Sequence, residues 1–162
     1  GVAVIRVGGS TEVEMTERKH RIEDALEAVK SAQEEGIVSG GGTSLLRASQ
    51  SIIITTREEA PGSYIAPGHD QLSGAMIVKN ACRSPIKQMA LNSGDSPDLI
   101  IDKVLESSFG FGWDFKNGRL TNMIDSGIID PVKVTKTALQ NAASCAGTLI
   151  TTNFGIIQTE DK

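Results

Sequence analysis

Residues 34–43 of the chain read Glu-Glu-Gly-Ile-Val-Ser-Gly-Gly-Gly-Thr, and this stretch separates a long charged segment from a second helical one. Three successive glycines remove every side chain at this point. Glycine adopts positive φ readily and lets another group approach the bare backbone closely. Backbone N–H groups just before a helix also suit a phosphate or ribose oxygen. We therefore take Gly40, Gly41 and Gly42 as a candidate nucleotide contact.

The glycine triplet alone is weak evidence for such a contact. Most glycine clusters are loops without a ligand, and this one matches neither a Walker phosphate loop nor a complete dinucleotide fingerprint. Motif specificity by itself favours a tight link between two helices.

The composition favours one folded domain with an aliphatic core. The 162 residues are 39% hydrophobic and 22% charged, which are ordinary values, but aromatic residues make up only 4%. The formal net charge of −4 gives no support to binding of nucleic acid or of an anionic membrane surface. No apolar run reaches the length of a membrane span. We therefore expect neither nucleic acid nor a membrane among the partners.

The first residues and the cysteines bear on the context of the chain. There is no initiator Met, and residues 1–5 read as a strand already under way, so we interpret the chain as part of a longer one. Cys82 and Cys145 sit among apolar residues in helical patterns, which predicts buried free thiols in a reducing compartment. His20 and His69 have no Cys or His at ligand spacing, so no metal site is predicted.

The segment before the glycines is predicted to be one long helix. Thr11 followed by Glu14 has the spacing of a capping box, and Gly36 is placed to end the helix after Glu35. Its first half is polar on nearly every side, whereas its second half has an apolar stripe. The stripe consists of Ile22, Ala25, Leu26, Val29 and Ala32. A helix that is half exposed and half docked is typical of a connector between two bodies.

The rest of the chain is predicted to be mainly helical with little sheet. Residues 109–119 are expected to form a hairpin because Asn117-Gly118 is a strong hairpin signal. The other expected elements are a strand over 2–7, a helix over 44–53, a loop over 57–69, a helix from Asp70 that breaks at Ser84-Pro85 and ends by Gly94, a helix over 97–106, a helix opened by Asp130-Pro131, a strand over 151–157 and a frayed end over 158–162.

Two carboxylates are candidates for chemistry. Asp24 lies where the long helix turns from polar to amphipathic, and a carboxylate there could orient a water or hold a magnesium ion. Carboxylates on helix surfaces are usually only solvated, however. Asp130 precedes a Pro at an expected helix start, which capping alone explains. The aromatic cluster at 109–115 could stack on a base, but without basic residues around it a small packed core is the simpler interpretation.

Five blocks of sequence carry a family resemblance. They are residues 12–15 (EVEM), 21–26 (RIEDAL), 34–42 (EEGIVSGGG), 122–131 (NMIDSGIIDP) and 138–144 (ALQNAAS). In this order they strongly resemble the group I chaperonins, the 60-kDa chaperonins of bacteria and organelles. The resemblance covers nearly the whole chain, and several blocks in register are far more specific than any one of them.

The resemblance implies a domain organisation and a fold class. Residues 1–34 are similar to the C-terminal segment of the intermediate domain, a strand followed by a long helix. Residues 35–162 are similar to the C-terminal half of the equatorial ATP-binding domain. The implied fold class is mainly α, with a small β-hairpin and short terminal strands.

The resemblance also implies roles for single residues at a nucleotide. Asp24 would be the catalytic carboxylate that moves onto the nucleotide and positions the attacking water and metal. Gly41 would approach the ribose with its backbone, and Asp130 would accept hydrogen bonds from the ribose hydroxyls. Ile128 would pack on the adenine, and Asp114 lies in a stretch that lines the adenine pocket.

Two further residues match subunit contacts of the family. Glu12 corresponds to a residue that pairs with a neighbouring subunit, and Lys87 to a basic residue at the contact between rings. Ser96 replaces the usual Glu partner of that basic residue, and Asp95 or Asp98 would have to substitute for it. The loop over 55–71 is longer than usual, and Phe115 and Lys116 replace small residues near the adenine.

The activity implied by the resemblance is ATP-dependent protein folding in a ring cavity. The implied cofactors are ATP and Mg²⁺, with most metal ligands outside this chain. The implied partners are copies of the subunit in a heptameric ring, single or double, a 10 kDa co-chaperonin and unfolded client proteins. The expected location is the cytoplasm in a bacterium, or the mitochondrial matrix or plastid in a eukaryote. The chain by itself is expected to be inactive.

The alternative function is a helical structural or oligomerisation module without a nucleotide role. A small dinucleotide-binding enzyme is disfavoured, because it requires alternating strands and helices and this chain has helix after helix.

Overall fold

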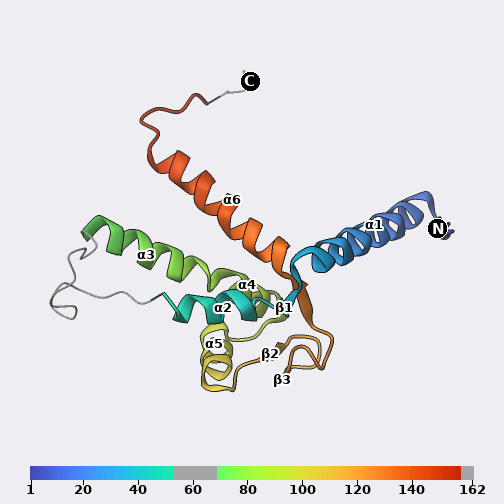
Figure 1. The fold of residues 1–162 in the computed structure, drawn as a ribbon, viewed down its shortest axis with the longest axis horizontal. Coiled ribbons are helices and arrows are strands. Elements are labelled where there is room, and N and C mark those ends of the chain that lie inside the picture. Colours follow the sequence, from blue (N-terminus) through green and yellow to red (C-terminus); the bar gives the residue numbers. More distant parts are fainter. Residues whose placement is uncertain (53–68, 158–162) are drawn as a thin grey trace.

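The computed structural model describes residues 1–52 and 69–157, and its elements radiate from one junction (Figure 1). The three arms are α1 (Glu12–Glu35), α3 (His69–Ala81) and α6 (Val132–Ile150). The compact body consists of α2 (Thr43–Gln50), α4 (Ser84–Ser93), α5 (Pro97–Glu106), β2 (Phe111–Asp114) and β3 (Arg119–Asn122). The short strands β1 (Ile37–Ser39) and β4 (Ile129–Pro131) lie near the base of α1 and α6. The predicted mainly helical fold is confirmed.

Helix α1 begins and ends as its sequence predicts. The side chain of Thr11 accepts a hydrogen bond from Glu14 N at 3.2 Å, and Glu14 Oε2 accepts from Ser10 N at 2.8 Å. These bonds satisfy N–H groups that a helix start leaves unpaired. At the other end Gly36 has a φ of 87° and donates its N–H to Ala32 O at 2.8 Å. Positive φ at this position is the reason that a glycine ends the helix.

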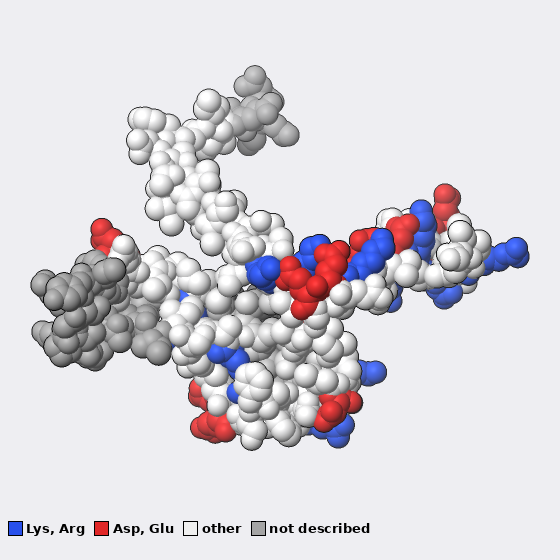
Figure 2. All heavy atoms as spheres, viewed as in Figure 1, with Lys and Arg blue, Asp and Glu red and all other residues white. Residues whose placement is uncertain are grey.

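The apolar stripe of α1 remains largely uncovered in this chain. Leu26 is 49% exposed and Val29 is 56% exposed, and no residue of the helix is buried. The exposed surface of α1 carries alternating acidic and basic side chains (Figure 2). Within the described residues, its ion pairs with another element lie at its C-terminal end, where Lys133 and Lys136 of α6 pair with Glu34 and Glu35. The helix is therefore a rod held at one end, as expected for a connector.

A short antiparallel ladder joins the two halves of the chain. β1 pairs with β4 over all three residues of each strand. At one end Val132 N donates to Gly36 O at 3.1 Å, and at the other end Gly40 N donates to Ile128 O at 2.9 Å. The ladder fixes the end of α1, the start of α6 and the glycine turn relative to one another. This pairing was not predicted, because each strand is only three residues long and β4 contains a proline.

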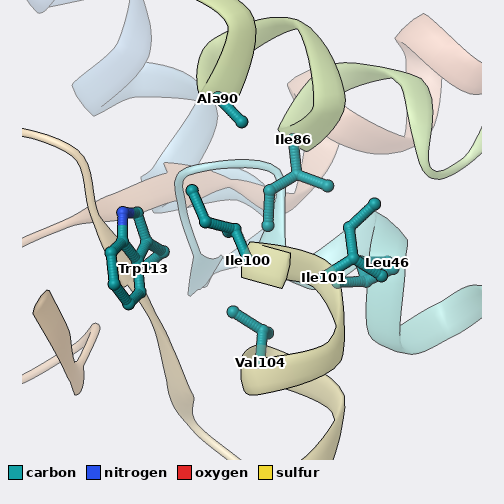
Figure 3. Close-up of a cluster of buried hydrophobic side chains, with 7 residues drawn as sticks. All are labelled: Leu46, Ile86, Ala90, Ile100, Ile101, Val104 and Trp113. Atoms are coloured by element: carbon teal, nitrogen blue, oxygen red, sulfur yellow. The ribbon is translucent and has the colours of Figure 1, made fainter. Parts of the chain in front are cut away.

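The hydrophobic core lies in the body below the ladder, where side chains from α2, α4, α5 and β2 converge (Figure 3). Its buried members are Leu46, Ile86, Ala90, Ile100, Ile101, Val104 and Trp113. Burial of a large aliphatic side chain contributes about 1.5–3 kcal/mol, so this cluster is the main source of stability in the body. Arg47 reinforces it, because its Nη2 donates to the carbonyl oxygens of Val104, Ser108 and Phe111 at 2.8–2.9 Å.

The predicted hairpin is confirmed as β2 and β3. Phe111 lies opposite Asn122, and Asp114 lies opposite Arg119. Gly118 supplies the positive φ of 62° that the turn requires. The helix break at Ser84-Pro85 is also confirmed, because α3 ends at Ala81 and α4 starts at Ser84 with its proline in the first turn.

Two predicted strands are wrong. Residues 2–7 and 151–157 form no strand, and most of their side chains are exposed. A strand needs a neighbour to satisfy its backbone groups, and no segment in the described part of the chain pairs with either of these two. High β-branched content was therefore insufficient evidence for a strand.

Two further expectations are corrected. Pro131 rather than Asp130 is the N-cap of α6, and both residues belong to β4. Cys145 is exposed, because no residue of α6 is buried in this chain, whereas Cys82 is buried as predicted and burial raises the pKa of its thiol. Most of the expected loop over 57–69, and the expected frayed end over 158–162, lie outside the described residues.

The close packing of Gly42 generates a prediction about stability. Gly42 has a φ of 72°, and a Cβ on it would lie 2.8 Å from the backbone nitrogen of Ile86. Because backbone strain and overpacking add, we expect Gly42→Ala to lower the free energy of unfolding by roughly 2–4 kcal/mol. Urea denaturation followed by circular dichroism measures this change.

The matched control for that substitution is Gly74→Ala in α3. A Cβ at Gly74 meets no atom within 4 Å, so this variant should gain about 0.5–1 kcal/mol from the restricted unfolded chain. Equal stability of the Gly42 and Gly74 variants would contradict the packing described here.

Candidate functional site

A different structural requirement explains the glycine at each of the positions 40, 41 and 42. Gly40 lies against the backbone of Ile128, where a Cβ would approach within 3.1 Å. Gly41 and Gly42 both have positive φ, 63° and 72°, and Thr43 N donates to Gly40 O at 3.1 Å. Two successive residues of positive φ give a tight turn that ordinary side chains resist. The turn presses Gly42 onto α4 and leaves Gly41 facing an open pocket.

This pocket has a volume of about 520 Å³ and lies between the glycine turn and the β2–β3 turn. Its lining residues are Gly41, Met89, Trp113, Asp114, Phe115, Lys116, Asn117, Ser126 and Ile128. Binding sites for small molecules commonly measure about 300–1,000 Å³, so this pocket lies within that range. Three residues predicted from the sequence, Gly41, Asp114 and Ile128, lie in it together.

Asp114 organises one wall of the pocket. Its Oδ1 accepts from Lys116 N at 3.0 Å and from Asn117 N at 3.2 Å, and its Oδ2 accepts from Asn117 Nδ2 at 2.6 Å. The hydrogen bond from the Asn117 side chain is the main reason that the pKa of Asp114 lies below its ordinary value. The carboxylate is therefore ionised at neutral pH, and both of its oxygens already accept hydrogen bonds from the turn that follows it.

The ladder positions Ile128 and Asp130 on the opposite side. Ile128 immediately precedes β4, and its carbonyl accepts from Gly40. Asp130 lies opposite Val38 in the ladder and does not line the pocket. Desolvation by partial burial raises the pKa of the Asp130 carboxyl. Burial in the ladder therefore disfavours the charged form of this carboxylate.

Asp24 and Glu12 share a distinctive property on α1. The other six acidic residues of this helix each pair with a lysine or arginine, whereas these two have no ion-pair partner within the described residues. Asp24 is exposed, and α1 contributes no residue to the lining of the pocket. Asp24 lies eleven residues before the end of the helix, which corresponds to roughly 16 Å along its axis. The structure thus leaves both carboxylates available but keeps Asp24 away from the pocket.

Lys87, the other predicted contact residue, pairs within the chain. Its Nζ lies 3.6 Å from Asp98 Oδ1, and both side chains are largely exposed. Exposed pairs of this kind contribute at most about 1 kcal/mol. Asp98 therefore lies near Lys87, where the usual Glu is replaced by Ser96.

Sequence reasoning missed several residues of the pocket. Met89 comes from α4, and Ser126 comes from the turn before Ile128. Neither carries a local signal, because only the tertiary fold brings α4 next to that turn. The sequence identified Trp113 only as a member of the aromatic cluster. In the structure its side chain belongs to the hydrophobic core and also borders the pocket.

Metal sites and membrane-spanning helices are absent from the part of the chain that the structure describes. Among residues 1–52 and 69–157, no group of three or more His, Cys, Asp and Glu side chains could hold a metal ion. None of the helices described there has the length and apolar character needed to cross a membrane.

Comparison with known proteins identifies the family. The model of the TCP-1/cpn60 chaperonin family matches residues 1–160. The chain belongs to the TCP-1/cpn60 chaperonin family. The prediction that the chain is a chaperonin is thereby confirmed, whereas the assignment to group I stays a prediction.

A solved chaperonin agrees with the family match. The structure described as "Crystal structure of group III chaperonin in the open state" superposes with a TM-score of 0.75 at 25% sequence identity. The match covers 93% of this chain and 30% of the solved one. The chain therefore spans about a third of the length of that chaperonin.

The raised pKa of Asp130 yields a prediction about pH. Below the ordinary value of 3.8 the carboxyl is neutral whether the chain is folded or unfolded, so its burial has little effect there. As the pH rises through the higher pKa of the folded state, the folded form loses stability relative to the unfolded one. We expect Asp130→Asn to raise the free energy of unfolding at pH 7, with a gain that shrinks as the pH approaches 3.8.

Urea denaturation of both proteins across this pH range measures that gain. Asp102→Asn, at an exposed position of α5, controls for the loss of one negative charge. A gain that is the same at all pH values would show that burial of the Asp130 carboxylate is not its cause.

Proposed function

We propose that this chain serves as the C-terminal part of an ATP-dependent chaperonin subunit. In this proposal residues 1–34 belong to the intermediate domain, and residues 35–162 belong to the equatorial ATP-binding domain. The observation that carries it is that Gly41, Asp114 and Ile128 line one pocket although they are far apart in the sequence. These are positions that the chaperonin resemblance assigns to the nucleotide. Membership of the chaperonin family supports the same function.

The residues of the pocket suit a nucleotide. Ile128 and Met89 provide apolar surface for a base, and Gly41 presents backbone without a side chain. We propose that Asp130, which follows the pocket residue Ile128 by two positions, accepts hydrogen bonds from ribose hydroxyls. ATP would supply the phosphoryl group that is transferred to water. We propose that the Mg²⁺ ligands and the phosphate-binding loop come mostly from the rest of the subunit.

Asp24 is the proposed catalytic carboxylate, and it acts by movement of α1. The helix is anchored at its C-terminal end and free along most of its length, so rotation about Gly36 would carry Asp24 as part of a rigid rod. Phosphoryl transfer depends mostly on positioning and charge neutralisation, and a single carboxylate that orients the attacking water suits this chemistry. The lack of any cation partner for Asp24 within the described residues leaves it free for that task.

The proposed assembly is the one that the resemblance implies. The subunit would form a heptameric ring of the group I type, with Glu12 contacting a neighbouring subunit and Lys87 lying at the contact between rings. Its partners would be a 10 kDa co-chaperonin and unfolded client proteins. The proposed location is the bacterial cytoplasm, or the mitochondrial matrix or plastid of a eukaryote.

Substitution at two positions tests this function in the complete subunit that contains the chain. A Cβ at Gly41 would lie 3.0 Å from Met123 Cε at a φ of 63°, so Gly41→Val distorts the glycine turn beside the pocket, and we expect calorimetry to show loss of ATP binding. Asp24→Ala should leave ATP binding intact and reduce ATP hydrolysis by about a hundredfold or more, because only the orientation of the water is lost. Glu27→Ala, which removes another exposed carboxylate of α1, is the matched control and should hydrolyse ATP normally.

Three outcomes would contradict the proposal. ATP hydrolysis at the wild-type rate in the Asp24 variant would exclude its catalytic role. ATP binding unaffected by Gly41→Val in a folded subunit would favour the alternative, a helical oligomerisation module. Measurable ATP turnover by the 162-residue chain alone would show that the remainder of the subunit is not required.

A further inference from the structure

Two methionines adjoin the pocket, and they differ in their access to solvent. Met89 belongs to α4, lines the pocket and is partly exposed. Met123 is 0% exposed, and its Cε lies 3.0 Å from the position that a Cβ on Gly41 would occupy. Met123 therefore packs behind the glycine turn, whereas the Met89 side chain can be reached from the pocket.

The position of Met89 on α4 follows from the helical repeat. Ile86 and Ala90 are buried and point into the hydrophobic core (Figure 3). Met89 lies three residues after Ile86, at the edge of that buried face. Lys87 and Gln88, on the outer face, are exposed. Core packing thus fixes the backbone of Met89 and leaves its side chain at the boundary between core and pocket.

Met89 is chemically distinct from the rest of the pocket wall. Among the described residues that line the pocket, it alone carries sulfur. The other large apolar lining residues are Trp113, Phe115 and Ile128. A thioether is apolar and polarizable, and it makes favourable contacts with aromatic rings. In its reduced form Met89 therefore suits a flat aromatic base.

Oxidation would change this surface without breaking the chain. Hydrogen peroxide transfers one oxygen atom to the Met89 sulfur: the O–O bond breaks, an S–O bond forms, the thioether loses two electrons and the peroxide is reduced to water. The product, methionine sulfoxide, is polar and chiral, and sulfoxide reductases return it to methionine. A polar oxygen in the pocket must lose its water when a base covers it, which disfavours binding.

We propose that Met89 is an oxidation site through which peroxide reversibly lowers the affinity of the pocket for nucleotide. This inference rests on the proposed nucleotide site and adds a form of regulation to it. The other three methionines of the chain lack this combination of access and position. Met123 is buried, whereas Met15 and Met76 are 41% and 52% exposed but belong to α1 and α3 and do not line the pocket.

The test treats the complete subunit with hydrogen peroxide and follows it by peptide mass spectrometry and calorimetry. Met15, Met76 and Met89 should be converted to the sulfoxide, and Met123 should react much more slowly because it is buried. Conversion of Met89 should weaken ATP and adenosine by the same factor, about fivefold or more, because both present the same base. Methionine sulfoxide reductase should then restore the original affinity.

Leucine variants assign the effect to one residue. Leucine keeps the volume and apolar character of methionine and has no sulfur to oxidise. The affinity of Met89→Leu for ATP should be the same before and after peroxide. Met15→Leu and Met76→Leu are the matched controls, and both should lose affinity on oxidation as the wild type does. Melting curves before and after treatment show whether each protein stays folded.

Several results would overturn the inference alone. They are resistance of Met89 to peroxide while Met15 and Met76 are converted, ATP affinity unchanged by oxidation of Met89, weakening of ATP without weakening of adenosine, and equal sensitivity of Met89→Leu and the wild type. Reversal by a thiol reductant in place of the reductase would assign the effect to a cysteine such as the exposed Cys145, and it has the same consequence. Absence of nucleotide binding by the untreated wild type overturns the proposed function as well.

Discussion

The antiparallel ladder between β1 and β4 is the constraint on which the rest of the structure depends. It is small, because it consists of two three-residue strands extended by the bonds Gly40 N to Ile128 O and Val132 N to Gly36 O. A single backbone hydrogen bond contributes only about 0.5–1.5 kcal/mol of net stability. Its importance is positional, since the same few bonds fix the base of α1, the first turn of α6, the glycine turn and Ile128. Both the anchor of the connector helix and one wall of the pocket are thus determined by one feature.

The second wall depends on a different kind of interaction. The hairpin is held against the core by Trp113 and Phe115, while the Asp114 carboxylate holds the turn that follows. One wall is therefore fixed by backbone pairing and the other by core packing and a side-chain network. This arrangement places the pocket on rigid elements, whereas Asp24 lies on a helix that is free along most of its length. Rigid pocket residues and a carboxylate on a movable helix are the two properties that the proposed hydrolytic site would require.

The parts of the fold that the sequence predicted are those with local causes. The limits of α1 follow from Thr11, Glu14 and Gly36, and the hairpin follows from Asn117-Gly118. Each of these signals acts over a few residues, so neighbouring sequence is sufficient to reveal it. The glycine triplet was identified for the correct physical reason, positive φ and close approach, although only Gly41 faces the pocket.

The parts that sequence could not supply are those that depend on distant contacts. Pairing of β1 with β4 joins segments about ninety residues apart, and neither strand is long enough to be recognised alone. Met89 and Ser126 enter the pocket for the same reason. The wrong strand predictions at 2–7 and 151–157 are the converse case, because their composition suggested strands whose pairing partners are absent from the described residues.

Amide hydrogen exchange of the complete subunit, with and without saturating ADP, tests the central claim most directly. That claim is that the β1–β4 ladder holds one wall of a nucleotide pocket. The account predicts that the amides of Gly40 and Val132, which donate to Ile128 O and Gly36 O at the two ends of the ladder, exchange slowly in the free protein and still more slowly with ADP. Rapid exchange at these amides, or exchange unchanged by ADP, would contradict it.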